Sequence, residues 1–267
     1  MSVLSDWVPR HRQWAALPWP DLQNLPHREH IPILQPIGAI EQHGPHLPLL
    51  VDSAIALAVV GRALALLEEE IPAYCLPPLY YGKSTEHEGF PGTISLRTET
   101  LIHLLMDVGE SVYRSGFRKW VLVNAHGGQP QVLEIVARDL HRRYPDFWVF
   151  PLFVWRVLAQ PERWLTPREI TEGIHAGDAE TSLLLHWYPE LVRMERAAPV
   201  YLPPADSCLS LEGALPWAWV TQDVSASGVL GDPTTATAAK GAEIWQALAE
   251  GWVQIIRDVH RFVPPSP

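Results

Sequence analysis

The feature that most constrains this chain is an apolar run that ends abruptly in two potential metal ligands. Residues 31–39 are mostly apolar, which is typical of a strand covered on both faces of a sheet. Glu41 and His43 follow at once, and a loop rich in glycine and proline separates them from Asp52. Side chains two apart on an extended chain point to the same side, so Glu41 and His43 can face one object together. The tight loop can bring Asp52 back to them.

Carboxylate oxygens and imidazole nitrogens are donors that Zn²⁺, Mn²⁺ and Fe²⁺ accept in proteins. A strand end with solvated polar side chains would contain the same residue types. Three potential ligands in one short loop favour a metal site, but on this segment alone both interpretations stay open.

Charge and cysteine content exclude several classes of protein. The net charge of -10 over 267 residues, without a Lys/Arg run, argues against a nucleic-acid surface. Only Cys75 and Cys208 occur, too few for a disulfide framework, which fits a reducing compartment. The longest apolar stretch, residues 54–67, contains Arg62 and is too short to cross a bilayer. We therefore expect a cytoplasmic protein with neither nucleic-acid nor membrane partners.

Apolar strand patterns alternate with helical patterns along the chain. Strands are predicted at residues 31–39, 73–80, 120–123 and 147–155, and helices at 53–70, 98–115, 130–144, 178–188 and 234–260. This alternation predicts an α/β fold, three α/β/α layers around a mostly parallel sheet, in a single domain over residues 1–267. Asp52 is expected to be the N-cap of the first long helix, and Asp232 that of the last.

Further polar residues follow the other strands. Glu86 and His87 follow the second, and His126 follows the third, just before two glycines. The carboxyl ends of parallel strands open onto one crevice, so these side chains can meet. His175 in a loop and Glu180 in the first turn of a helix can reach the same cavity, as a proton shuttle and an oxygen ligand. An acidic residue at a helix start is also favoured by the helix dipole without any function.

In chain order, these motifs resemble the creatininase (creatinine amidohydrolase) family of metal-dependent amidohydrolases. The matching segments are residues 38–48 with Asp52, 86–93, 124–128, 175–182 and 228–233. The resemblance extends over about residues 15–255. It implies a three-layer α/β/α fold with two divalent metal ions, zinc or manganese, and iron is chemically possible.

The resemblance also implies roles for individual side chains. Four are implied to bind metal: Glu41, His43, Asp52 and His126. Asp52 would bridge the two ions, and His175 would be the catalytic acid/base. Creatininase itself carries a ligand carboxylate two residues after the histidine that corresponds to His126, where this chain has Gly128. We expect Glu180 to take that place.

The implied reaction is hydrolysis of a non-peptide C–N bond in a small cyclic or formyl amide by a metal-activated water. Glu86 and His87 are expected to line the substrate mouth, with a structural role in their loop as the alternative. The tryptophan that precedes the catalytic histidine in creatininase is missing, since residues 171–174 read Thr-Glu-Gly-Ile, so creatinine is not the expected substrate. A lactone or a modified peptide end, on which other relatives act, stays an alternative.

A second class of function is a metal-stabilised, non-catalytic assembly or binding subunit. The presence of His175 beside a full ligand set favours an enzyme, because a structural metal needs no acid/base. A hydrolase that uses Ser53 or Cys75 as nucleophile lacks the Gly-x-Ser-x-Gly elbow. Members of the family are commonly hexamers built from dimers, so a homo-oligomer (hexamer) is expected.

Overall fold

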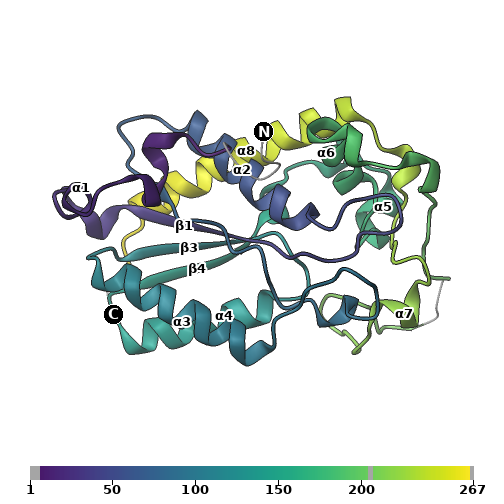
Figure 1. Ribbon diagram of the computed structural model, residues 1–267, viewed down its shortest axis with the longest axis horizontal. Coiled ribbons are helices and arrows are strands. Elements are labelled where there is room, and N and C mark those ends of the chain that lie inside the picture. Colours follow the sequence, from purple (N-terminus) through teal and green to yellow (C-terminus); the bar gives the residue numbers. More distant parts are fainter. Residues whose placement is uncertain (1–6, 204–206, 265–267) are drawn as a thin grey trace.

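A parallel sheet of four strands organises the computed structural model, which describes residues 7–203 and 207–264 (Figure 1). Its strands are β1 (Pro32–Ile37), β2 (Tyr74–Cys75), β3 (Lys119–Asn124) and β4 (Trp148–Phe153). They lie in the order β2-β1-β3-β4, and every neighbouring pair is parallel. The predicted parallel sheet is confirmed.

Helices cover both faces of the sheet. α2 (Val51–Leu66), α6 (Asp178–Trp187) and α8 (Ala238–Arg261) lie on one face, and α3 (Thr98–Arg114) and α4 (Pro130–Arg143) lie on the other (Figure 1). Three short helices complete the set: α1 (Trp19–Gln23), α5 (Pro167–Glu172) and α7 (Thr221–Val224). The predicted three-layer α/β/α arrangement is therefore confirmed. Within the described ranges, no helix is long and apolar enough to cross a membrane.

The two hydrophobic cores follow from alternation along the strands. In β3, Trp120 and Leu122 belong to the core under α3 and α4, whereas Val121 and Val123 belong to the core under α2 and α8. All four are buried, and each contributes about 1.5–3 kcal/mol relative to an exposed position. β3 is buried along its whole length, which explains its continuous apolar sequence.

Three predicted boundaries are wrong. Asp52 is the second residue of α2, not its N-cap, and Leu50 occupies the cap position without a side-chain cap bond. The strand predicted at residues 73–80 pairs regularly only in β2, since two prolines follow and proline has no N–H for the ladder. Asp232 caps a 3₁₀ turn, and the Thr237 side chain accepts from Lys240 N at the start of α8.

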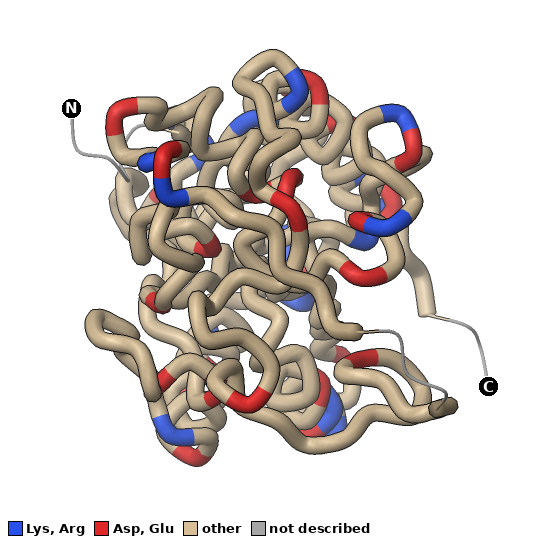
Figure 2. Tube along the Cα trace, turned by 90° about the vertical axis from the view of Figure 1, so that its right-hand side faces the viewer, with Lys and Arg blue, Asp and Glu red and all other residues tan. Residues whose placement is uncertain are grey.

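The loops after the strands gather at the end of the molecule that also carries α5 and α7 (Figure 1). Figure 2 looks at this end, where acidic positions occur near the middle of the view as well as at its rim.

Candidate metal centre

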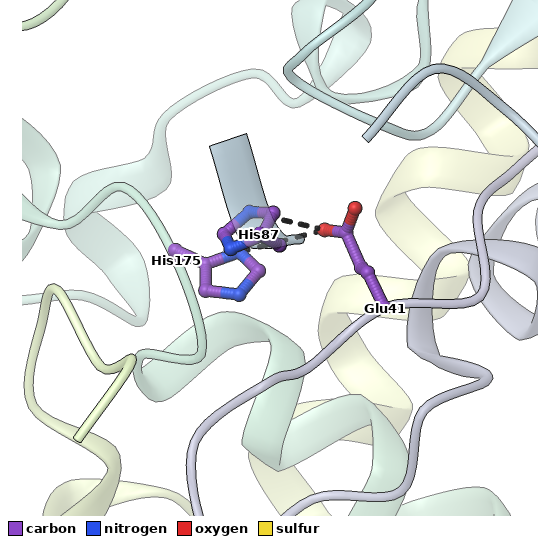
Figure 3. A group of neighbouring side chains, drawn as sticks. All are labelled: Glu41, His87 and His175. Carbon is purple, nitrogen blue, oxygen red and sulfur yellow. Dashed lines mark ion pairs between the residues drawn. The ribbon is translucent and has the colours of Figure 1, made fainter. Parts of the chain in front are cut away.

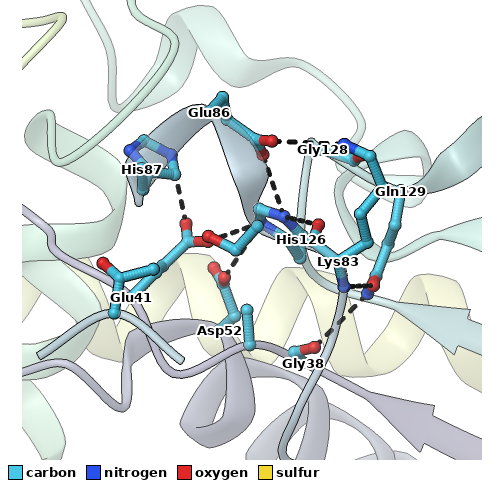
Figure 4. A network of polar contacts seen from close by, with 12 residues as sticks. Gly38, Glu41, Asp52, Lys83, Glu86, His87, His126, Gly128 and Gln129 are labelled. Carbon is cyan, nitrogen blue, oxygen red and sulfur yellow. Dashed lines mark hydrogen bonds and ion pairs between the residues drawn. The ribbon is translucent and has the colours of Figure 1, made fainter. Parts of the chain in front are cut away.

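The predicted site residues converge at the carboxyl end of the sheet. Overlapping groups of side chains, with donor atoms within 4.8 Å of one another in each group, contain all of them: Glu41, His43, Asp52, Glu86, His87, His126, His175 and Glu180. Figures 3 and 4 show parts of this cluster. The carboxyl ends of β1 and β3, the 3₁₀ turn Thr85–His87, the loop of His175 and the first turns of α2 and α6 supply it. The structure thus brings the predicted site residues together.

A close approach of β1 to α2 brings the first ligand candidates together. A Cβ at Gly38 would lie 2.6 Å from the backbone nitrogen of Ser53, so only glycine allows this contact. Ser53 Oγ then donates to Ala39 O at 3.0 Å and ties the end of the strand to the helix. Asp52, in the first turn of α2, is thereby held beside Glu41.

One group of donors surrounds His126 Nδ1. Glu41 Oε2 lies 3.1 Å from this nitrogen and Asp52 Oδ2 lies 3.3 Å from it. Ligand atoms bound at about 2.0–2.1 Å to a tetrahedral zinc ion lie about 3.3 Å apart. The distances of Glu41 Oε2 and Asp52 Oδ2 from His126 Nδ1 therefore match the spacing of two ligands around one ion.

A second group surrounds His43. Its Nδ1 faces Glu41 O at 3.2 Å, and since a carbonyl oxygen only accepts, the ring hydrogen belongs there. Nε2 faces Asp52 Oδ1 at 3.4 Å and carries the lone pair of the ring only when the imidazole is neutral. His43, His175 and Glu180 also share one group of close donor atoms. The two oxygens of Asp52 thus face two different imidazoles, the geometry of a bridging carboxylate.

Some polar atoms of this centre are buried without a hydrogen bond to any residue that the structure describes. Among the described residues, His43 Nε2 and Asp52 Oδ2 are buried without a hydrogen bond. Unpaired buried polar atoms are costly, so they indicate a missing ligand. A pair of divalent cations fits them, because imidazole nitrogen and carboxylate oxygen are the donors that such ions take.

The protonation of the cluster agrees with this. Burial lowers the pKa of His43, but the attraction of Asp52 outweighs it and raises the pKa to about 9. In the same way, Glu41 raises the pKa of His126 against the effect of burial. Burial raises the pKa of Glu180 to about 7. Protons on the imidazoles balance the carboxylates here, and a cation would replace them.

His175 is held in one orientation. Its Nε2–H donates to Gln42 O at 2.7 Å, so Nδ1 carries the lone pair, 3.9 Å from Glu41 Oε1 (Figure 3). Burial lowers the pKa of His175 well below its ordinary value, which keeps the ring neutral. Two backbone hydrogen bonds with Leu230 fix the loop, and Ala176 adopts a positive φ of 55°. A neutral base therefore faces the cluster.

His87 lies deeper than a residue at a substrate mouth, with 3% of its surface exposed. Its Nδ1 is 2.7 Å from both Gln42 Nε2 and Thr221 Oγ1, and its Nε2 is 3.5 Å from Glu41 Oε1. The His87 ring stacks on that of His175 with centroids 4.2 Å apart (Figure 3).

The side chains that hold the candidate ligands in place were not predicted from the sequence. Ser84 donates to Glu41 Oε2, Gln42 contacts both His87 and His175, and Thr221 contacts His87. Gln42 lies in the sequence between two predicted ligands, and this position could have marked it as a site residue. Ser84 and Thr221 lie in irregular segments, and no local pattern marks them.

Comparison with known proteins agrees with the site. The family model described as "Creatininase: Creatinine amidohydrolase" matches residues 15–256. The chain is 39% identical over 231 residues to the mycofactocin precursor peptide peptidase of Mycobacterium ulcerans, covering 84% of each protein. It is 31% identical over 245 residues to the creatinine amidohydrolase of Pseudomonas putida, covering 85% of this chain and 88% of that protein.

A solved structure extends the match to the whole fold. The structure titled "Creatininase Mn" has a TM-score of 0.76 and 28% sequence identity, and the match covers 95% of this chain and 99% of that one. That title and the donor groups above support divalent metal ions as cofactors. The resemblance seen in the motifs is confirmed: this chain belongs to the creatininase family and is a creatininase-like hydrolase that acts on C–N bonds.

Proposed function

We propose that this protein is a metal-dependent amidohydrolase that hydrolyses a non-peptide C–N bond of a small cyclic or formyl amide through a metal-activated water. The observation that carries the proposal is the position of Asp52, whose two oxygens face His126 Nδ1 and His43 Nε2 at 3.3 and 3.4 Å. A buried carboxylate between two imidazoles is suited to bridging two divalent ions.

In this proposal, Glu41, Asp52 and His126 would hold one ion, and His43, Asp52 and Glu180 would hold the other. Zinc and manganese fit these donors, and iron is possible. Such a pair of ions supplies a water of lowered pKa and a positive charge that polarises a carbonyl group. The Glu180 carboxylate lies close to His43, which supports it as the carboxylate that replaces a ligand at Gly128.

His175 is the proposed acid/base. Because Gln42 O holds its Nε2–H, the ring can take up a proton only at Nδ1, the nitrogen that faces Glu41. From there it can accept a proton from the attacking water and return it to the leaving nitrogen. Its lowered pKa supports this role, since a base must be neutral before it accepts.

We propose His87 as a substrate-binding residue. Its Nδ1 has close partners in Gln42 and Thr221, which leaves Nε2 directed toward the cluster near Glu41. An imidazole N–H at that point can donate to a carbonyl oxygen of a small amide. Glu86 was also expected to contact substrate, but its surroundings support a different role, argued below.

A peptide-end hydrolase is the second candidate. The observation that favours it is the 39% identity to the mycofactocin precursor peptide peptidase, against 31% to the creatinine amidohydrolase. A lactone hydrolase of the same fold and a non-catalytic binding subunit are further alternatives. The free lone pair of His175 beside the donor groups argues for catalysis over a purely structural metal site.

A substrate screen tests the proposal. Purified protein loaded with Zn²⁺ or Mn²⁺ is incubated with small cyclic amides, formamides, lactones and peptides with modified ends. We expect turnover of an amide or formamide that a chelator abolishes and added metal restores. Cleavage of peptide ends alone would favour the second candidate, and full metal occupancy without any turnover would favour a binding subunit.

We also propose a homo-oligomer, a hexamer, in the cytoplasm. Large apolar side chains are exposed on the single chain, which supports subunit contacts: Trp19, Leu209, Leu215 and Trp217. Light scattering gives the mass in solution, and a monomeric mass would contradict this proposal.

A further inference from the structure

The outer edge of the His126 ring has its own set of contacts. Nδ1 faces Glu41 and Asp52, whereas Nε2 lies 2.8 Å from Lys83 O and 3.1 Å from Glu86 Oε1 (Figure 4). A carbonyl oxygen only accepts, so Nε2 carries a hydrogen. In the neutral ring the lone pair is therefore on Nδ1, the nitrogen that faces the candidate metal position.

Glu86 is held in place against this edge. Lys83 Nζ lies 3.4 Å from Glu86 Oε2 and donates to Gly128 O at 3.1 Å. Glu86 Oε1 is buried and forms no hydrogen bond among the described residues, and its close polar neighbour is His126. The Glu86 side chain is only 13% exposed. Its negative charge thus acts on the imidazole rather than on solvent.

Gly128 makes room for this carboxylate. A Cβ at position 128 would lie 1.6 Å from Glu86 Oε1 and 2.6 Å from His126 Nε2. Any side chain at 128 would displace Glu86 or the ring. A carboxylate ligand at 128 and Glu86 in its present position therefore exclude each other in this arrangement.

We propose that Glu86 is a positioning residue for His126, not a substrate contact. This inference rests on the proposed function, because it takes His126 to be a metal ligand. An anion beside the outer N–H of a ligand histidine fixes its orientation and makes the other nitrogen a better donor. Gly128 and Lys83 complete the arrangement, since one provides the space and the other secures the carboxylate.

Zinc affinity is the first test, measured on the full-length protein by competition with a chelator and without substrate. Glu86→Gln keeps the size of the side chain and removes its charge. We expect it to bind Zn²⁺ about 10–100-fold more weakly than wild type. The matched control is Glu88→Gln, an exposed carboxylate two residues away, which leaves the affinity unchanged.

A spectroscopic test separates positioning from a general structural role. In the zinc-loaded protein, we expect the Nε2–H proton of His126 to resonate downfield, because it is hydrogen-bonded to Lys83 O and lies next to the Glu86 carboxylate. Glu86→Gln moves this resonance upfield and speeds its exchange with water. Lys83→Met keeps the carbonyl oxygen that accepts from His126 and removes only the cation at Glu86, so it produces a smaller shift in the same direction.

The inference is overturned if Glu86→Gln binds zinc like wild type, keeps the His126 resonance and changes only KM, because Glu86 is then a substrate contact. That result would leave the proposed function intact. Failure of the wild-type protein to bind zinc would instead refute the proposed function, and this inference with it.

Discussion

The two ends of β3 both bury charge, but only one end satisfies it. At the amino end, Lys119 is 3% exposed, and its Nζ donates at 2.7–2.8 Å to the carbonyl oxygens of Val259, His260 and Phe262. An ammonium has three donors, and here each has an acceptor. At the carboxyl end, His126 enters a cluster in which His43 Nε2 and Asp52 Oδ2 have no hydrogen bond among the described residues.

Burial of charge alone is therefore not a sign of a functional site. Glu169 is also buried, yet its carboxylate accepts from Asp178 N, Asp232 N and Tyr201 Oη, and ties α5 to α6 and to the loop before the last helix. A closed set of donors and acceptors stabilises the fold and requires nothing else. An open set is costly unless a ligand completes it. The carboxyl end of β3 is the open kind.

The strongest test of this contrast is Asp52→Ala, which removes the carboxylate that faces both imidazoles. We expect loss of both ions and a fall in activity of at least about 10⁴-fold, because water then keeps a pKa near about 15.7 instead of about 7. Metal content and turnover are measured together. The control is Asp178→Ala, which removes a buried carboxylate with closed contacts to Ser182, Thr235 and Lys240 and should destabilise the fold without emptying the centre. If Asp52→Ala still binds two ions, the contrast between the two ends of β3 does not depend on metal binding by Asp52, and this interpretation is wrong.

His175→Ala separates chemistry from metal binding. Activity should fall by about 10²–10⁴-fold, the usual contribution of a positioned acid/base, while both ions stay bound. His186→Ala, in a histidine outside the cluster, serves as the control and should keep full activity. Loss of an ion in His175→Ala would mean that this ring is a ligand rather than the proton shuttle.

The α/β/α layers and the candidate metal ligands could be predicted from the sequence because both depend on local sequence patterns. The apolar run of β1 and the spacing of Glu41 and His43 are examples. Asp52 was misread as an N-cap, since an Asp before an apolar helix is equally typical of a cap, and only its tertiary neighbours decide. Thr221 could not be predicted, because its partner His87 is 134 positions away and no periodicity connects them.

Metal binding at the carboxyl end of β3 should depend on pH, whereas the Lys119 contacts at its amino end should not. The pKa of His43 is raised to about 9, so at pH 7 the ring carries a proton that an incoming cation must displace. Asp52, Glu180 and Glu41 supply the negative charge that holds this proton. Zinc affinity should therefore rise by about tenfold per pH unit from pH 7 to about 9, or about 100-fold in all, and then level off.

Calorimetry in two buffers with different ionisation enthalpies counts the protons released. At pH 7, at least one proton should be released for every two zinc ions that bind. Zinc binding without proton release at that pH would show that His43 is already neutral, and the cluster would then not be balanced by protons.

The smallest effect is expected from Lys119→Met, which opens the closed end. Methionine is similar in length, so the change leaves the carbonyl oxygens of Val259, His260 and Phe262 without the ammonium that now satisfies them. We expect the free energy of unfolding to fall by about 2 kcal/mol, with zinc affinity and turnover per folded molecule unchanged. Chemical denaturation followed by tryptophan fluorescence measures the first quantity. A matching loss of zinc affinity would mean that a change at one end of β3 affects His126 at the other end. The two ends would then not be energetically independent.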